Sequence, residues 1–278
     1  MLLTLALLPA TGCASPRRPA AAPPPALERP PVVATPSAPP AAVEPYVETT
    51  EIGRTVEGRP LVMHVFGRGT CDLFVVGGIH GNEPGSAVVC EELVKHLRSN
   101  PAALMGRTVA VLPAANPDGL ARRLRTNKNL VDLNRNFPAS NWKKTRKGGL
   151  YGGAVAASEP ETQAMLDVLE RLGPRAIISV HAMAQPCNNY DGPAEALAQL
   201  MSMTNGYPVR PNMGYPTPGS LGTWAGVDRQ IPIVTLELPA KQRGEDGWTD
   251  NRYALLAAID RNTPESGPVT TGGRGAAN

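Results

Sequence analysis

The sequence predicts an α/β domain built on a mixed, largely parallel central sheet with helices on both faces. Short runs of apolar and β-branched residues alternate along the chain with longer stretches whose apolar residues recur at helical spacing. Strands that alternate with helices form largely parallel sheets, which need cover on both sides. A chain of 278 residues has room for one such domain together with terminal extensions.

Five short apolar runs are predicted to be strands, namely Leu61–Phe66, Leu73–Val76, Val109–Leu112, Ala176–Val180 and Ile233–Leu238. Helical spacing predicts four helices, over Glu83–Leu97, Ser158–Leu172, Pro193–Met203 and Asn251–Ile259. The segment Ser158-Glu159-Pro160-Glu161 has the form of a capping box at the start of the second helix. The stretch Gly119–Ala157 has little regular pattern, and loops of that length are usually functional.

The composition places the domain at residues 47–262 and indicates extensions on both sides. Residues 1–13 form a short apolar run that ends in Ala10-Thr11-Gly12-Cys13, which resembles a bacterial lipobox. Residues 14–46 are rich in Pro and Ala and are expected to form an extended linker, while residues 263–278 are expected to be disordered. We therefore expect an exported, periplasmic protein that a lipid on Cys13 anchors to the outer membrane. The alternative is a cleaved signal peptide in which Cys13 is incidental.

Charge and cysteine content limit the classes of partner. A net charge of +3 is too small to indicate nucleic acid, and no other segment is long and apolar enough to span a membrane. Membrane contact is therefore expected only through the lipid anchor. Positive charge does gather at Lys143–Lys147, for which a solvated loop face is the simpler interpretation. Cys71, Cys90 and Cys187 allow either one disulfide and a free thiol or three buried thiols.

Three polar residues lie at the ends of predicted strands, where an open α/β sheet gathers its ligands. They are His80, His181 and Glu237, and Glu83 lies one helical turn after His80. Two imidazoles and one carboxylate suit a catalytic zinc ion, because a fourth coordination position stays open for water. Glycines before and after His80 permit a tight turn that exposes both side chains of the pair. We therefore predict one Zn²⁺ ion bound by His80, Glu83 and His181.

Taken together, these residues resemble the zinc carboxypeptidase family. The segment Gly78-Ile79-His80-Gly81-Asn82-Glu83 is similar to the first metal motif of that family, and Ser179-Val180-His181 is similar to the second. The run Val131-Asp132-Leu133-Asn134-Arg135-Asn136-Phe137-Pro138 is a more specific match. Asn189-Tyr190-Asp191-Gly192-Pro193 and Tyr215-Pro216-Thr217-Pro218-Gly219-Ser220 look most like the bacterial murein peptide amidase branch, which cuts the bond between D-glutamate and diaminopimelate in cell-wall peptides.

The resemblance implies catalytic roles for further residues. Glu237 would be the general base that takes a proton from the attacking water and passes it to the leaving amine. Arg125 would stabilise the oxyanion of the tetrahedral intermediate, with Arg123 as a rival for that role. Asp132 would accept a hydrogen bond from His80 and so orient this ligand.

Substrate-binding roles follow from the same resemblance. Asn134 and Arg135 would bind the carboxylate of the substrate, because an arginine fork matches two carboxylate oxygens. Tyr215 is the nearest counterpart of the tyrosine that closes over that carboxylate in the family. Leu221 occupies the position at which an acidic residue selects basic side chains in the animal enzymes, so the side-chain preference stays open.

The expected function is zinc-dependent hydrolysis of a peptide bond near the C-terminus of a short peptide, by a metallocarboxypeptidase or amidase. The resemblance favours the γ-D-glutamyl-diaminopimelate bond of cell-wall muropeptides. One alternative is a zinc deacylase of the aspartoacylase type, which shares the segment His80-Gly81-Asn82-Glu83. Another is an inactive wall-binding lipoprotein that retains the metal, against which the presence of Glu237 and Arg125 argues.

Overall fold

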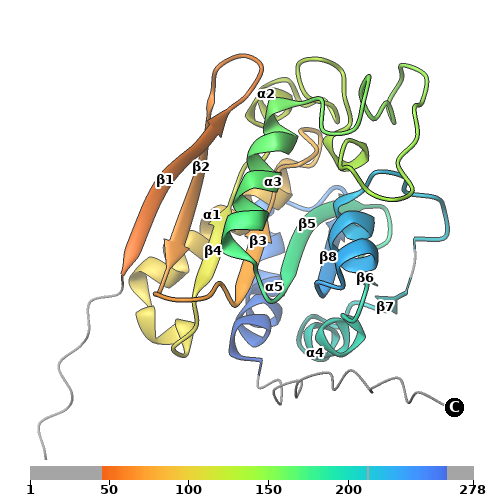
Figure 1. Ribbon diagram of the computed structural model, residues 1–278. Coiled ribbons are helices and arrows are strands. Elements are labelled where there is room, and N and C mark those ends of the chain that lie inside the picture. Colours follow the sequence, from red (N-terminus) through yellow and green to blue (C-terminus); the bar gives the residue numbers. More distant parts are fainter. Residues whose placement is uncertain (1–45, 212, 262–278) are drawn as a thin grey trace, which may run out of the picture. The chain divides into compact units, whose positions relative to one another are not determined.

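The computed structural model describes residues 46–211 and 213–261, and Figure 1 shows their arrangement. The predicted leader with its lipidation site Cys13, the linker up to residue 45 and the tail at residues 263–278 lie outside the described residues. The centre of the domain is an eight-stranded sheet with the strand order β1-β2-β4-β3-β5-β8-β6-β7. Strands β4, β3, β5 and β8 run parallel, whereas β2 and β6 join the two sides of this group in antiparallel orientation. The predicted mixed, largely parallel sheet is confirmed.

The strands are β1 (Val47–Arg54), β2 (Pro60–Phe66), β3 (Leu73–Val76), β4 (Val109–Leu112), β5 (Ile177–Met183), β6 (Cys187–Asp191), β7 (Val209–Arg210) and β8 (Ile233–Pro239). The α-helices are α1 (Pro84–Ser99), α2 (Pro117–Arg122), α3 (Pro160–Leu172), α4 (Glu195–Asn205) and α5 (Gly244–Asp260). Two 3₁₀ turns, η1 (Pro101–Leu104) and η2 (Leu133–Arg135), and a π-helix, η3 (Gly222–Val227), complete the described elements.

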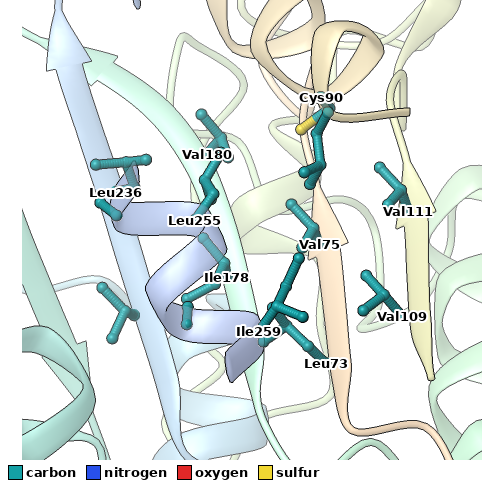
Figure 2. Packing of buried hydrophobic residues seen from close by; sticks show 14 of the residues in the cluster. Leu73, Val75, Cys90, Val109, Val111, Ile178, Val180, Leu236, Leu255 and Ile259 are labelled. Atoms are coloured by element: carbon teal, nitrogen blue, oxygen red, sulfur yellow. The ribbon is translucent and has the colours of Figure 1, made fainter. Parts of the chain in front are cut away.

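Two hydrophobic clusters cover the two faces of the sheet. Successive residues of a strand point to opposite faces, so Val75 belongs to the cluster that includes residues of α1, α4 and α5, whereas Phe74 and Val76 belong to the cluster with α3 and η3. Figure 2 shows the first cluster, in which Leu255 and Ile259 of α5 lie against the central strands. Both faces of these strands are buried, and their sequences are accordingly apolar throughout. The predicted helices on both faces are therefore present.

Several elements differ from the prediction. Strands β1, β6 and β7 were not predicted, and α2 and η3 replace segments without a predicted structure. Helix α5 begins at Gly244, earlier than the predicted Asn251. Cys71, Cys90 and Cys187 are three buried free thiols, so the disulfide alternative is not realised. Within the described residues, no helix combines the length and apolar character needed to cross a bilayer.

The predicted capping box does not form at the start of α3. Glu159 occupies the cap position without a side-chain cap bond, and the hydroxyl of Ser158 donates to the Glu159 carboxylate at 2.7 Å. The carboxylate of Glu161 accepts from the backbone N–H of Val56 and from Nδ2 of Asn127 instead of reaching back to the cap. The Glu161 carboxylate, which a capping box would need, is therefore used in tertiary hydrogen bonds.

Candidate active site

The turn between β3 and α1 carries the first two predicted metal ligands. Gly78 adopts a φ of +61°, a conformation that side chains other than glycine rarely adopt. A Cβ atom on Gly81 would lie 1.9 Å from the carbonyl carbon of Gly119, so only glycine allows this close approach. The tight turn places His80 beyond the end of β3 and Glu83 at the N-terminus of α1.

His80, Glu83 and His181 meet in one buried cluster, in which their ligand atoms all lie within 4.8 Å of one another. Nδ1 of His80 lies 2.8 Å from Oε1 of Glu83. Nδ1 of His181 lies 3.1 Å from Oε2 of Glu83 and 3.1 Å from Nδ1 of His80. His181 comes from β5, which pairs directly with β3. The adjacent parallel strands therefore bring together residues that are far apart in the sequence.

The chemistry of this cluster fits a zinc ion. Nε2 of His80 lies 3.0 Å from Oδ1 of Asp132, and an N–H donated there leaves a lone pair on Nδ1. That lone pair faces the Glu83 carboxylate and the Nδ1 atom of His181, so electron-pair donors converge on one point. A cation at this point satisfies all of them. A carboxylate that accepts from the other ring nitrogen, as Asp132 does here, is the usual support of a metal-binding histidine. The residues are therefore suited to hold the predicted ion.

Ionisation in the cluster also favours a cation. Burial by itself opposes ionisation of Glu83, but in the metal-free cluster the imidazoles of His181 and His80 beside its carboxylate outweigh burial and hold the Glu83 pKa well below its usual range. Burial likewise lowers the pKa of His181, which keeps its imidazole neutral. The Glu83 carboxylate and the neutral imidazole of His181 are therefore in the states that a metal ion requires of its ligands. Burial opposes protonation of His80, but Asp132 and Glu83 outweigh burial and raise the pKa of His80, so this imidazole must lose its Nδ1 proton when a metal ion binds.

Asp132 connects the metal cluster to Arg125. Asp132 is fully buried, and its second oxygen, Oδ2, accepts from Nε of Arg125 at 2.9 Å. Burial raises the pKa of Asp132, but the hydrogen bond with His80 and the nearby positive charges outweigh it, and the net pKa is about 2. The guanidinium of Arg125 lies 3.6 Å from Glu83 at the wall of the pocket. Its rival Arg123 is exposed at the end of α2 and does not line the pocket.

The predicted general base, Glu237, lies beside the metal cluster without belonging to it. Glu237 is 7% exposed on β8 and is the register partner of His181 on β5. No hydrogen bond or ion pair of its carboxylate is found within the described residues. Burial, and then the charge of Glu83, raise the pKa of Glu237 to about 8. A cation in the cluster would oppose the Glu83 charge and return this pKa toward the range of an ionised base.

The predicted substrate-binding residues surround the same pocket. Arg135 is 5% exposed and has no carboxylate partner among the described residues, while its Nη1 donates to the carbonyl of Asn134. Oδ1 of Asn134 accepts from the backbone of Leu221 at 2.9 Å, which fixes the orientation of this amide at the pocket wall. Tyr215 is 54% exposed at the pocket rim. Leu221 itself packs into the core and does not line the pocket.

Asp191 is a pocket residue to which the sequence pattern assigns no role. It ends β6 and lines the pocket, and its carboxylate has no hydrogen bond or ion pair within the described residues. Burial raises the pKa of Asp191. A Cβ atom on Gly222 would lie 2.3 Å from Oδ2 of Asp191, and one on Gly226 would lie 2.7 Å from its Cβ. The glycines of the π-helix therefore leave space for this carboxylate at the pocket wall.

The geometry assembles the parts that hydrolysis of an amide needs. A metal cluster, an unpaired carboxylate and a guanidinium line one pocket, so an attacking water, a proton acceptor and an oxyanion donor can meet there.

Comparison with known proteins agrees with this chemistry. The model of the family described as zinc carboxypeptidase matches residues 41–208, which include all three residues of the metal cluster. Glu237 lies beyond the matched residues.

Two bacterial relatives are similar over most of their length. The murein peptide amidase A of Escherichia coli K12 is 33% identical over 205 residues, which cover 69% of this chain and 81% of the relative. The enzyme of the same name from Vibrio campbellii is 32% identical over 213 residues, which cover 69% and 80%.

Solved structures show the same fold. The murein-tripeptide amidase of Escherichia coli O157 superimposes with a TM-score of 0.63 at 29% identity, covering 77% of this chain and 92% of the other. Bovine thrombin-activatable fibrinolysis inhibitor superimposes with a TM-score of 0.64 at 22% identity, covering 77% and 88%, and supports the fold alone. From the family match, the identity to the bacterial relatives and the assembled pocket, the chain belongs to the zinc carboxypeptidase family and is a peptide hydrolase.

Proposed function

We propose that this protein is a zinc-dependent amidase that cleaves the γ-D-glutamyl-diaminopimelate bond of short cell-wall peptides. The observation that carries the proposal is the pair of uncompensated charges in the pocket. Arg135 offers a buried guanidinium without a carboxylate partner, and Asp191 offers a carboxylate without a cationic partner. Two bacterial relatives of this chain bear the name murein peptide amidase A, which supports the same substrate class.

Diaminopimelate carries the two charges that such a pocket complements. Its α-carboxylate would bind Arg135 and the amide of Asn134, since an arginine fork matches two carboxylate oxygens. The ammonium group at the far end of its side chain would bind Asp191. A plain aliphatic residue would leave the Asp191 carboxylate unpaired in a partly buried place, which is unfavourable.

The residues of the site then have separate tasks in the hydrolysis. Zinc held by His80, Glu83 and His181 would supply a Lewis acid for the scissile carbonyl and lower the pKa of water to about 7. Glu237 accepts the proton of the attacking water and delivers it to the leaving amine of diaminopimelate. Arg125 donates to the oxygen that becomes negative in the transition state.

The proposal is tested with two peptides and the purified full-length protein. L-alanyl-γ-D-glutamyl-diaminopimelate should yield free diaminopimelate, identified by mass, and should be cleaved faster than a plain L-peptide with a free α-carboxylate. A faster reaction with the plain peptide would leave a zinc peptidase but refute the amidase assignment. Preference for a small N-acyl amino acid would support the aspartoacylase-type alternative. Bound zinc without turnover of any substrate would support an inactive wall-binding protein.

We further propose that the protein is periplasmic and attached to the outer membrane through a lipid on Cys13. The lipobox-like segment Ala10-Thr11-Gly12-Cys13 and the Pro- and Ala-rich segment after it support this location. The variant Cys13→Ala should move from the membrane fraction to the soluble periplasmic fraction. A parent protein that is already soluble there would refute the anchor.

A further inference from the structure

A cluster of uncompensated positive charge lies on the loop that precedes α3. We call residues 140–152 the basic loop, and its cationic residues are Lys143, Lys144, Arg146 and Lys147. All four are exposed, and none has an ion pair or a hydrogen bond within the described residues. The sequence contains no Asp or Glu between Asp132 and Glu159, so no acidic neighbour along the chain offsets this charge.

A second basic group on the domain behaves differently. Arg59, Arg122 and Lys128 all pair with Glu57, and Arg59 also pairs with Asp118. Those cations are therefore compensated by the protein itself. Asp228 accepts from the N–H and the hydroxyl of Ser140 at the base of the basic loop, at 2.8 and 2.5 Å. The four exposed cations have no such partner within the described residues and are available to an external anion.

The basic loop is attached to the wall of the active-site pocket. Oδ1 of Asn141 accepts from the backbone N–H of Gly219 at 3.0 Å, and Nδ2 of Asn141 donates to Oγ1 of Thr223 at 3.2 Å. A Cβ atom on Gly219 would lie 2.6 Å from the indole of Trp142 and 2.4 Å from the carbonyl of Arg135. The base of the loop therefore packs on the turn whose neighbours, Thr217 and Ser220, line the pocket.

The loop is also closed by its own hydrogen bonds. Oγ1 of Thr145 donates to the carbonyl of Leu150 at 3.2 Å and accepts from the N–H of Gly152 at 3.2 Å. Nε1 of Trp142 donates to the carbonyl of Gly152 at 3.3 Å. These bonds join the two sides of the loop, so the backbone that carries the exposed cations is held next to the turn at Gly219.

We propose that the basic loop is an anion-binding surface that attracts carboxylate-rich peptides to the pocket and contacts the carboxylates that remain outside it. The inference rests on the proposed function only in requiring a peptide substrate with several carboxylates. In the γ-linked peptide, the α-carboxylate of D-glutamate is free and lies on the acyl side of the scissile bond. Charge of one sign beside a cleft raises the association rate of a ligand of the opposite charge. At 1 M salt the Debye length is about 3 Å, so the attraction beyond that distance is screened.

The test replaces the cations and varies one carboxylate. The loop variant is Lys143→Gln/Lys144→Gln/Arg146→Gln/Lys147→Gln. The control is Arg68→Gln/Arg98→Gln/Arg171→Gln/Arg175→Gln, which removes equal charge from residues that do not line the pocket, near the ends of α1 and α3 and the starts of β3 and β5. The substrates are the γ-D-glutamyl tripeptide and its analogue with a carboxamide in place of the free D-glutamyl α-carboxylate.

At low ionic strength, the loop variant should lose about 3- to 10-fold in kcat/KM for the tripeptide, with little change in kcat. The loop variant should lose less than about twofold in kcat/KM for the carboxamide analogue, and the control variant should lose less than about twofold for the tripeptide. At about 1 M salt, every combination of variant and substrate should lose less than about twofold. Equal kcat/KM and equal salt dependence in the loop variant and the parent would overturn the proposal. Equal losses on both substrates would overturn it as well.

Two further arms separate other outcomes. If the tripeptide is not cleaved, the proposed function fails, and the loop is tested on plain peptides that carry Glu-Glu or Gln-Gln before the cleaved residue. The parent should prefer the Glu-Glu peptide, and the loop variant should not. Sedimentation with phosphatidylglycerol vesicles tests a lipid surface. The peptide role would be refuted if the parent and the control variant bind these vesicles, the loop variant does not, and the peptide kinetics of the loop variant are unchanged.

Discussion

Replacing Asp132 by Asn tests whether one carboxylate serves both the metal cluster and the oxyanion donor. Oδ1 of Asp132 accepts from Nε2 of His80 and from the backbone N–H of Asn134, both at 3.0 Å, while Oδ2 accepts from Nε of Arg125 at 2.9 Å. The side chain of Asn has the same shape but only one accepting oxygen. Asp132→Asn must therefore turn its NH₂ group toward one set of donors.

The geometry indicates which set is lost. If the amide oxygen takes the place of Oδ1, the bonds from His80 and Asn134 are kept and the NH₂ group faces the donor of Arg125. If the amide is flipped, only the bond from Arg125 is kept and the NH₂ group faces two donors. The first orientation is favoured, so Arg125 should be displaced. Loss of an oxyanion donor costs about 10²–10³-fold in turnover, and a displaced donor should cost about 10- to 100-fold. Loss of the negative charge next to His80 should weaken zinc binding by about tenfold, or roughly 1.4 kcal/mol.

Two measurements separate these effects. Competition with a chelator gives the zinc dissociation constant, and kcat/KM at saturating zinc gives the effect on Arg125. Asp72→Asn is a matched control, because Asp72 accepts a backbone N–H just before the start of β3, does not line the pocket and should change neither quantity. Zinc affinity reduced more than about hundredfold, with normal turnover at saturating zinc, would refute the assigned orientation. Unchanged values for both would show that Asp132 supports neither group.

The remaining predictions address single residues of the pocket. His181→Ala should lose most of its zinc by elemental analysis, because it removes one of the three proposed ligands in the cluster; a full equivalent of zinc would contradict the site. Glu237→Gln should reduce turnover about 10²–10⁴-fold with zinc content near normal, and a variant as fast as the parent would exclude the general-base role. Asp191→Asn should lose about tenfold or more in kcat/KM for the diaminopimelate peptide and little for a peptide that ends in an aliphatic residue. In metal-free protein, Glu237 has a pKa of about 8 against 4.5 for an ordinary Glu. The unfolded chain therefore binds fewer protons than the native protein between these values, and the free energy of unfolding should fall as pH rises from about 5 to 8. Urea midpoints should show this fall, and Glu237→Gln should make it smaller; the raised pKa of His80 contributes a fall of the same sign, which the variant should keep.

The metal cluster could be predicted because its residues follow apolar strands. His80 and His181 come after runs that are buried on both faces, and such strands lie parallel in the centre of a sheet. The long irregular stretch was a useful signal as well, since Arg125, Asp132 and Arg135 all lie in it and all reach the site. Their positions depend on tertiary hydrogen bonds, so the pattern alone could not place them.

Asp191 could not be placed from the pattern because its strand is polar. The sequence of β6 is Cys-Asn-Asn-Tyr-Asp, which has neither an apolar run nor a regular alternation. Its strand conformation depends on pairing with β8, where Cys187 is opposite Glu237 and Asp191 is opposite Ile233. The same limit applies to the π-helix, since the glycines that leave space for Asp191 have no local signature of a pocket wall. Long-range pairing therefore places the carboxylate to which we assign a role in specificity.

The distribution of charge in the pocket separates catalysis from recognition. Asp132 compensates Arg125 and orients His80, so the catalytic end of the pocket is held in place without a substrate. Arg135 and Asp191 lack such partners within the described residues, and uncompensated charge in a partly buried place lowers the stability of the empty protein. A ligand with a carboxylate and an ammonium group would pair both at once, whereas a ligand with one charge would leave the other unpaired. On the proposed function, specificity in this pocket comes from charges that only the bound substrate completes.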